Sequence, residues 1–504
     1  MAFGDQAKFE KGLRADLPRG LKGQEDRLPR TLWAEPQELT AEWEKYRKGA
    51  ALFLGYRGGR EIGWSDDRHA LTVAGTRAGK GASLIIPNLL QYDGSVLAID
   101  PKGELARITG RYRESIGDRF VLDPFGENGR WPTAHYNPMD ELDPNHREVI
   151  DQAGSIADAL VIYSGKGDPH WTSAARGVLR GLILMLLDFD QSQRNLVAMR
   201  EVLMLVHPAV QARHDIVTKK MKPEDQHKAS KGKTLAEMMI AMGDRFERVV
   251  CGQGEALRDM ADKERESVLS EARTQTQFLD SPALRDILKT SSFSLKDLSR
   301  KKVSVFLCLP ARHMNTHDRW LRVIVNLAID ALEPRRGPQR VAAASVPVLL
   351  LLEEFPVLGT MEKLEAAAGQ LAGSGVKLWV IIQNLGQLKR HYKQGWETFI
   401  ANSGVLTAFG NADLETLEYL AKKMGKVAMN VVRRSGASPS QLLDGAAPQS
   451  EELRDAALLE VDELSHNLAR EKKRVLVLAA GQPPLVLERA QYFSDAHFKG
   501  LFDE

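Results

Sequence analysis

Hydrophobic residues recur along this chain in two patterns: short runs typical of buried strands, and longer stretches with the spacing of an amphipathic helix. From His69 to about residue 145, and again beyond about residue 290, the two patterns alternate. Such alternation predicts βαβ units and a mostly parallel sheet, and therefore an α/β fold. The expected strands are Leu71–Ala74, Ser95–Asp100, Phe120–Asp123, Val303–Leu309, Val346–Leu352, Val376–Gln383, Val405–Phe409, Lys426–Val432 and Arg474–Ala479.

The alternation stops between these two regions, where every apolar segment has helical period. We expect an all-helical domain at residues 146–290, inserted into an α/β domain formed by residues 61–145 and 291–504. Residues 1–60 are polar and punctuated by Pro and Gly, which predicts an arm or docking segment with a short amphipathic helix around Leu39–Leu54. The helices expected in the insertion are Trp171–Leu187, Leu196–Val206, Leu235–Val250 and Glu255–Leu279, and the expected polar loops are Lys219–Lys233 and Arg434–Ser450.

The segment His69–Asn88 has the layout of a P-loop, with an apolar strand, a Gly-rich turn and an apolar helix, Ala82–Leu90. Backbone N–H groups of such a turn cradle an anion, the helix N-terminus adds positive potential, and Lys80 is expected to reach the β- and γ-phosphates. Ala74 stands where the first Gly is usual, and Gly81 stands where a Ser or Thr usually holds Mg²⁺. An ordinary Gly-rich turn is the alternative. The expected phosphate-contacting residues are Gly75, Thr76, Arg77, Ala78, Gly79, Lys80, Gly81 and Ala82.

A second strand, within Pro347–Gly359, ends in two carboxylates. Five consecutive apolar residues predict a strand buried on both faces, with its acids at the carboxyl edge of the sheet, where ligands bind. This is the logic of a Walker B strand, in which Glu353 holds Mg²⁺ directly or through water and Glu354 acts on the attacking water. The alternative is a solvated pair of glutamates at the start of a loop.

The strand that follows ends in Gln383 and Asn384. An amide at this position can sense the γ-phosphate and orient water, although strand ends often carry such residues for local hydrogen bonding. If the three strands pack side by side, Lys80, the glutamates and Gln383 meet in one cleft. We therefore expect Lys80, Glu354 and Gln383 to be catalytic.

Composition adds few constraints. The 504 residues carry a net charge of only +2, so any binding of a polyanion must come from local patches. Cys251 and Cys308 lie far apart and form no disulfide or metal-ligand pattern, which fits a reducing cytoplasm. No window reaches the roughly 18–20 apolar residues of a membrane helix, and the first residues contain no secretory signal.

Two basic patches are weak candidates for DNA contact, because a solvated helix face explains each of them equally well. One comprises Arg107, Arg111 and Arg113, and the other is Lys389–Lys393. Arg390 is also a candidate for the trans-acting arginine of a ring ATPase, although a surface arginine is the simpler interpretation.

With these features together, the chain from His69 to Phe502 resembles the type IV secretion coupling proteins, the TraG/TraD-like ATPases of conjugative DNA transfer. In that subgroup the P-loop also lacks the first Gly and has Gly after the lysine, whereas Asp is more usual at the position of Glu353. The segments that carry the resemblance, in chain order, are GTRAGKGAS, LIIPNLL, IDPKGEL, VLDPF, YNPMDEL, LLLLEEFPVLG, IIQNLGQLKRHY, FGNADLETLEYLAKKMG and GQPPLVLERAQYFSD.

The resemblance implies a RecA-like P-loop motor with an inserted all-helical domain, assembled as a homo-hexamer with ATP and Mg²⁺ between neighbouring subunits. It implies transfer of single-stranded DNA with its relaxase, or of an effector protein, to a type IV secretion channel with its ATPases and inner-membrane components. Most members begin with a transmembrane domain, and here the P-loop arrives by residue 75 with no spanning helix before it. We therefore expect a cytoplasmic protein, peripheral at the inner membrane, either of a soluble subgroup or anchored by a separate membrane subunit.

Two other functions remain open at this point. The missing Ser/Thr after Lys80 and the missing anchor would suit a substrate receptor or adaptor that binds nucleotide without strong turnover. A DNA-pumping ATPase of the FtsK/HerA kind shares the core chemistry, but the long helical insertion and the YNPMDEL and QYFSD segments count against it.

Overall fold

The structure is a computed structural model, and it describes residues 33, 51–163, 168–219, 231–333, 346–371, 375–434 and 449–503. Parts of three predicted segments lie outside these ranges: most of the expected helix around Leu39–Leu54, most of the loop Lys219–Lys233 and most of the loop Arg434–Ser450. At the edges of these gaps, α8 (Lys231–Ile240) already begins at residue 231 and β11 (Gln449–Ala457) at residue 449.

An 11-stranded sheet, in the order β2-β1-β13-β12-β9-β3-β8-β7-β4-β6-β5, forms the centre of the described chain. The seven strands from β9 to β5 are parallel, and the other four add antiparallel at one edge. The strands are β1 (Leu52–Arg57), β2 (Arg60–Trp64), β3 (His69–Ala74), β4 (Val96–Ile99), β5 (Asp118–Leu122), β6 (Val303–Leu307), β7 (Val348–Leu352), β8 (Val376–Ile382), β9 (Ser403–Phe409), β12 (Arg474–Ala479) and β13 (Leu485–Glu488).

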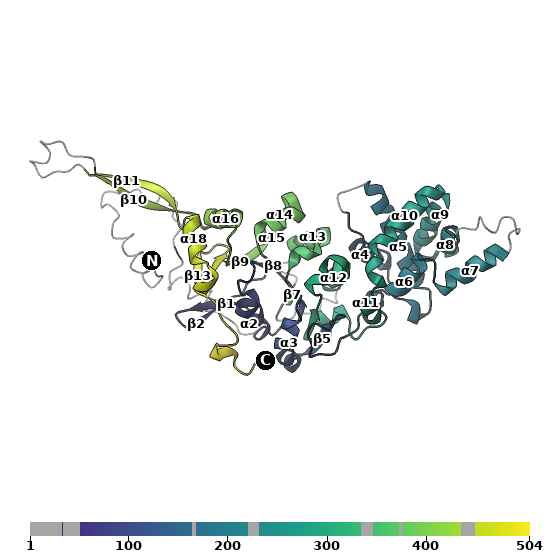
Figure 1. Ribbon diagram of the computed structural model, residues 1–504, viewed down its shortest axis with the longest axis horizontal. Helices are drawn as coiled ribbons and strands as arrows, with labels where there is room; N and C mark the ends of the chain where they lie inside the picture. The colour runs from purple at the N-terminus through teal and green to yellow at the C-terminus, as the bar shows by residue number, and fades with distance from the viewer. Residues whose placement is uncertain are drawn as a thin grey trace, which may run out of the picture.

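The predicted parallel sheet is thus confirmed, and its antiparallel edge was only partly predicted. β1 falls inside the segment expected to be an arm or helix. Its residues Leu52–Leu54 are buried, and its Tyr56 pairs with Glu488 of β13, more than 400 positions away. Such a distant partner leaves no local signal in the sequence. A second, two-stranded sheet of β10 (Lys426–Arg434) and β11 projects from the left of Figure 1.

Helices cover both faces of the main sheet (Figure 1). The short α2 (Ile86–Leu89) and α3 (Glu104–Ile116) pack with β1 around one buried core. A second core on the opposite face is formed with the remaining helices, and it continues into the helical region at the right of Figure 1. These helices are α12 (Ala311–Leu332), α13 (Glu362–Gln370), α14 (Leu385–Tyr392), α15 (Trp396–Ala401), α16 (Leu414–Met424) and α18 (Val461–Asn467).

The region predicted to be an all-helical insertion contains no strand among its described residues. We call its helices α4–α11 the helical block. Two predicted helices are interrupted: the chain turns between α8 and α9, where Phe246, Glu247 and Arg248 have positive φ, and again at Met260–Ala261 between α9 and α10. The domain boundaries themselves stay a prediction. The helices are α4 (Val149–Leu160), α5 (Pro169–Leu186), α6 (Leu196–Leu203), α7 (Pro208–Lys219), α8, α9 (Val249–Asp259), α10 (Asp262–Gln275) and α11 (Pro282–Ile287).

Among the described residues, no helix has both the length and the apolar character needed to cross a membrane.

Candidate nucleotide-binding site

The turn after β3 has the shape of an anion cradle. The backbone N–H of Ala78 donates to the carbonyl of Gly75 at 3.1 Å and closes the turn. Arg77 and Gly79 have φ values of 56° and 89°, and such left-handed residues in a turn form the concave nests that bind anions. Gly75 is needed for a steric reason, since a Cβ there would lie 1.9 Å from the carbonyl oxygen of Gly410.

The helix after the turn starts with a five-residue π-type turn, η4 (Gly81–Ile85), rather than as the continuous helix expected from Ala82. The hydroxyl of Ser83 donates to the carbonyl of Gly79 at 2.8 Å, so it is occupied within the loop. A Cβ added at Gly81 would meet no atom within 4 Å. The position where related P-loops carry a hydroxyl therefore opens onto free space.

Lys80 meets both predicted glutamates. β7 delivers Glu353 and Glu354 to the carboxyl edge of the sheet, and Nζ of Lys80 lies 2.7 Å from Oε1 of Glu354 and 3.5 Å from Oε1 of Glu353. Glu354 has φ 52°, an unfavourable left-handed conformation for a glutamate, which is common at functional sites. The predicted convergence of the first two strand ends is confirmed.

Gln383 completes the cluster from β8, the strand between β3 and β7. Its Nε2 donates to Oε2 of Glu354 at 3.1 Å, and its Oε1 accepts from the hydroxyl of Thr76 at 2.8 Å. The amide therefore links the P-loop to the acid pair. All three predicted strand ends meet in one place, although the catalytic role of each residue stays a prediction.

Burial raises the pKa values of two carboxyl groups at this edge of the sheet. Burial raises the pKa of Glu353, and the ammonium group of Lys80 opposes that effect. Asp100, after the neighbouring β4, is fully buried, and burial raises its pKa to about 7 although it accepts a hydrogen bond from the N–H of Ala106 at 2.8 Å. Lys102, two residues further along, is exposed and pairs with Glu104 at 4.0 Å.

Comparison with known proteins identifies the family. A sequence model of the type IV secretory system conjugative DNA transfer family matches residues 33–502 of the chain. The chain belongs to this family. It is 28% identical over 446 residues to the protein VirD4 of Rhizobium rhizogenes and 27% identical over 464 residues to the conjugal transfer protein TraG of Escherichia coli. The aligned region is 86% of this chain in both cases, but 60% of VirD4 and 68% of TraG.

Solved structures agree on the fold of this family member. It is similar to the bacterial conjugative coupling protein TrwBdeltaN70 in complex with sulphate, with a TM-score of 0.63, 16% identity, and coverage of 92% of this chain and 95% of that chain. TrwB in complex with the ATP analogue ADPNP gives a TM-score of 0.61 at 16% identity, with the same coverage. At this identity the likeness concerns the fold alone, and it confirms the predicted RecA-like P-loop architecture.

Arg489 is a residue that the sequence did not single out. It follows β13, and its guanidinium donates to the P-loop carbonyl of Ala78 and, at 2.8 Å, to the carbonyl of Arg470. Its Cζ also lies 4.6 Å from the centroid of the Phe409 ring. This arginine therefore links the P-loop, at Ala78, to the antiparallel edge of the sheet. Arg489 lies in one of the segments that carry the family resemblance, but its distance of about 400 positions from the loop hid the contact.

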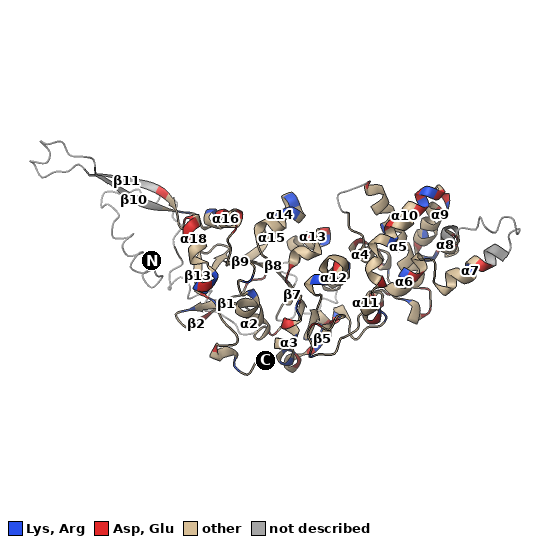
Figure 2. Ribbon diagram, in the orientation of Figure 1, with Lys and Arg blue, Asp and Glu red and all other residues tan. Residues whose placement is uncertain are grey.

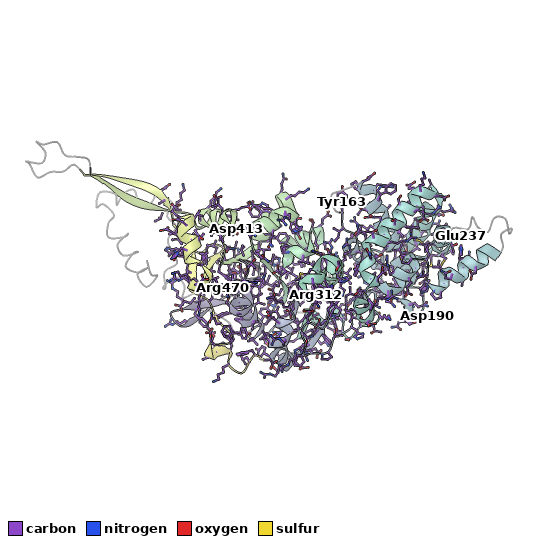
Figure 3. The ribbon with its side chains drawn as sticks, viewed as in Figure 1. Tyr163, Asp190, Glu237, Arg312, Asp413 and Arg470 are labelled. Atoms are coloured by element: carbon purple, nitrogen blue, oxygen red, sulfur yellow. The ribbon has the colours of Figure 1, made fainter. Side chains whose placement is uncertain are left out.

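A pocket of about 320 Å³ opens beside the P-loop of this family member, on the side that carries Arg489. Phe493, with 58% of its surface exposed, lines this pocket together with the cationic residues Arg470 and Lys473. Figure 3 labels Arg470, which lies close to the end of α18. The remaining lining residues are Ala78, Gly79, Ala82, Ser83, Glu471, Arg489, Ala490 and Gln491.

The structure places the candidate DNA-contacting arginines in different surroundings. Arg113 is buried and donates to the carbonyls of Tyr92 and Gly94 and to the hydroxyl of Ser304, so its proposed role in DNA contact is wrong.

Arg111 is turned to the C-terminal segment, where it pairs with Asp503 at 2.8 Å. The patch Lys389–Lys393 lies at the end of α14, where Figure 2 shows basic residues, and Arg390 in it is exposed. Its roles as a DNA contact or a trans-acting arginine stay predictions.

Proposed function

We propose that this protein binds ATP and Mg²⁺ at the P-loop and hydrolyses the γ-phosphate bond. The observation that carries the proposal is the hydrogen-bonded cluster of Lys80, Glu354 and Gln383, delivered by three adjacent parallel strands, with Glu353 beside it. Phosphoryl transfer depends on positioning and charge neutralisation, and this cluster supplies a cation, two carboxylates and an amide within a few ångströms.

The ammonium group of Lys80 neutralises the glutamates in this structure. When ATP enters, Lys80 turns to the β- and γ-phosphates, which leaves the carboxylate of Glu354 free to accept a proton from water. Gln383 then holds that water with its amide, next to the Thr76 hydroxyl at the P-loop. The backbone from Gly75 to Ala82 surrounds the phosphates.

The residues present fit a magnesium ion. Carboxylate oxygens are ligands that Mg²⁺ prefers, and the ion usually keeps several waters and phosphate oxygens besides one or two carboxylates. Glu353 would hold it, and the open space at Gly81 leaves room for a water where a hydroxyl ligand is usual. When bound, Mg²⁺ neutralises charge on the β- and γ-phosphates.

The pocket beside the P-loop suits the nucleoside part of ATP. Phe493 offers an exposed aromatic face for a base, and Arg470 and Lys473 offer cations near the path of the phosphates. Bases stack on aromatic side chains regardless of their identity, so this pocket favours nucleotides over inorganic polyphosphates.

The family membership supports a role in conjugative DNA transfer. The chain spans 60% of the length of the VirD4 relative, so the activity and partners of such proteins are proposals here. The structure of TrwB with ADP and Mg²⁺ supports the same choice of ligands. We propose that residues 61–145 and 291–504 form the motor of a homo-hexamer, that residues 146–290 face the substrate, and that the protein works peripherally at the inner membrane.

The proposed cargo is single-stranded DNA with its relaxase, or an effector protein, delivered to the secretion channel with its ATPases. A receptor or adaptor with weak turnover is the second candidate. The specific observation that favours it is Gly81, which offers no hydroxyl ligand for Mg²⁺.

Steady-state ATP hydrolysis, with and without single-stranded DNA, tests the proposal. Lys80→Ala and Glu354→Gln should each lower kcat by about 100-fold or more while the proteins stay folded. Lys102→Ala, which removes an exposed lysine near the same edge, is the matched control and should retain activity. Full turnover by Lys80→Ala would refute the mechanism, and nucleotide binding without turnover by the wild-type protein would favour the receptor.

A further inference from the structure

Arg322, in the middle of α12, contacts two parts of the molecule with one buried guanidinium. Its Nε donates to the carbonyl of Ala159 in the last turn of α4 at 3.1 Å. Its Nη1 donates to the carbonyl of Leu358 and, at 2.9 Å, to the carbonyl of Thr360. α4 belongs to the helical block, whereas the two other carbonyls belong to the loop that follows Glu354, so one planar group joins the block to this loop.

The end of α4 depends on this contact. The last carbonyls of a helix have no partner within the helix, and a cation at that end interacts favourably with the helix dipole. Arg319, one turn before Arg322, donates to the carbonyl of Leu160 at 3.1 Å. Its guanidinium also donates to Oε1 of Gln275 in α10 at 2.7 Å. Two arginines of α12 therefore cap the same helix of the block, but only Arg322 also reaches the loop after Glu354. Figure 3 labels Tyr163, shortly after α4, where the block meets the rest of the molecule.

The loop after Glu354 is held at both ends, and Arg322 contributes at its far end. Glu354 itself has a left-handed backbone conformation, which persists only if the surrounding structure holds it. The short η11 (Phe355–Leu358) follows, and Tyr392 of α14 donates its hydroxyl to the carbonyl of Gly359 at 3.3 Å. Arg322 contacts the carbonyls on both sides of Gly359. A shift of Arg322 must therefore move this loop or break its hydrogen bonds.

We propose that Arg322 is a positioning residue that couples the helical block to Glu354. Because the guanidinium is rigid, a displacement of α4 against α12 is transmitted to the loop that sets the position of the Glu354 carboxylate. Coupling between two sites is reciprocal, so nucleotide bound at the P-loop must in turn change the stability of the α4 end. Substrate engaged by the helical block would thereby adjust the rate of hydrolysis. The inference rests on the proposed ATPase function.

The test compares Arg322→Lys with Arg319→Lys. Lysine keeps the charge at either position, but it lacks the rigid planar fork whose Nε and Nη1 donate to α4 and to the loop. Arg322→Lys should lower kcat by roughly 10- to 100-fold, because a small misplacement of a catalytic group has an effect of that size, and should leave KM for ATP within about twofold. Arg319→Lys, the matched control, loses contacts to the block alone and should keep kcat within about twofold of the wild type.

Hydrogen exchange of α4 and η11, measured with and without ADPNP and Mg²⁺, distinguishes coupling from a purely structural role of Arg322. In the wild-type protein and in Arg319→Lys, nucleotide should change the exchange of both segments, whereas in Arg322→Lys it should change η11 alone. A kcat for Arg322→Lys equal to that of the wild type, equal losses in both variants, or no nucleotide effect on α4 in the wild type would overturn the coupling. A wild-type protein that neither binds nor hydrolyses ATP would instead refute the proposed function on which the inference rests.

Discussion

The pocket beside the P-loop makes a prediction that separates the base of ATP from its phosphates. Phe493 lines this pocket with 58% of its surface exposed, and the cluster around Lys80 is the proposed phosphate site of the same loop. Replacing Phe493 with Ala should therefore weaken the binding of ATP without changing the binding of inorganic tripolyphosphate. Replacing Lys80 with Ala should weaken both ligands.

The magnitude follows from the contact that is lost. Base–aromatic stacking contributes about 1–3 kcal/mol per base in alanine substitutions. Phe493 lies at the surface, with more than half of the residue exposed, so it can cover only one face of the base. We therefore expect a stacking energy in the lower half of this range. A loss of about 1–2 kcal/mol corresponds to a rise in the Kd for ATP of roughly 5- to 30-fold. Phe493→Trp keeps an aromatic face and should restore the affinity of the wild type.

Titration calorimetry with ATP and with tripolyphosphate, both with Mg²⁺, measures the difference directly. Leu414→Ala is a matched control, since Leu414 is an apolar side chain of similar exposure, 61%, on α16 and outside the pocket. An unchanged Kd for ATP in Phe493→Ala, or a loss of tripolyphosphate binding by the same factor as ATP, would refute stacking of the base on this ring.

Two further predictions concern the same edge of the sheet. Gly81→Ser should fold normally, because a Cβ at this position meets no atom within 4 Å. The added hydroxyl should lower the Mg²⁺ concentration needed for half-maximal hydrolysis. A higher Mg²⁺ concentration at half-maximal hydrolysis would contradict the open site. Asp100→Asn should raise the thermal stability at pH 8 but not at pH 4. The pKa of Asp100 is raised from 3.8 to about 7, so its contribution to stability is present below pH 4 and is lost as the pH rises through 7. The difference corresponds to at most about 4 kcal/mol, and an equal effect of the substitution at both pH values in thermal melts would contradict this assignment.

The parts of the site that the sequence predicted share a physical origin. Lys80, the glutamates and Gln383 each come after a short, fully buried and mostly apolar strand, and parallel strands align their carboxyl ends at one edge. Local pattern and sheet geometry are therefore enough to bring them together. The α/β fold followed from the alternation of such runs with helices, and its RecA-like form followed from the resemblance of the motifs.

The parts that were missed depend on contacts between distant segments. β1 pairs with β13, and Arg489 reaches the P-loop, through distances of about 400 positions that no window of sequence can reveal. Arg113 has the spacing of a basic helix face, yet it turns inward to three oxygen acceptors around β4 and β6. Arg322 likewise gives no sign in the sequence that its guanidinium lies between α4 and the loop after Glu354.

A structure of the protein with a non-hydrolysable ATP analogue and Mg²⁺ tests the central claim most directly. The account predicts a triphosphate in the turn from Gly75 to Ala82, with the Lys80 ammonium moved from Glu354 to the β- and γ-phosphates and with Gln383 and Glu354 facing the γ-phosphate. A triphosphate bound elsewhere, or a Lys80 that remains paired with Glu354 while the nucleotide occupies the loop, would contradict it.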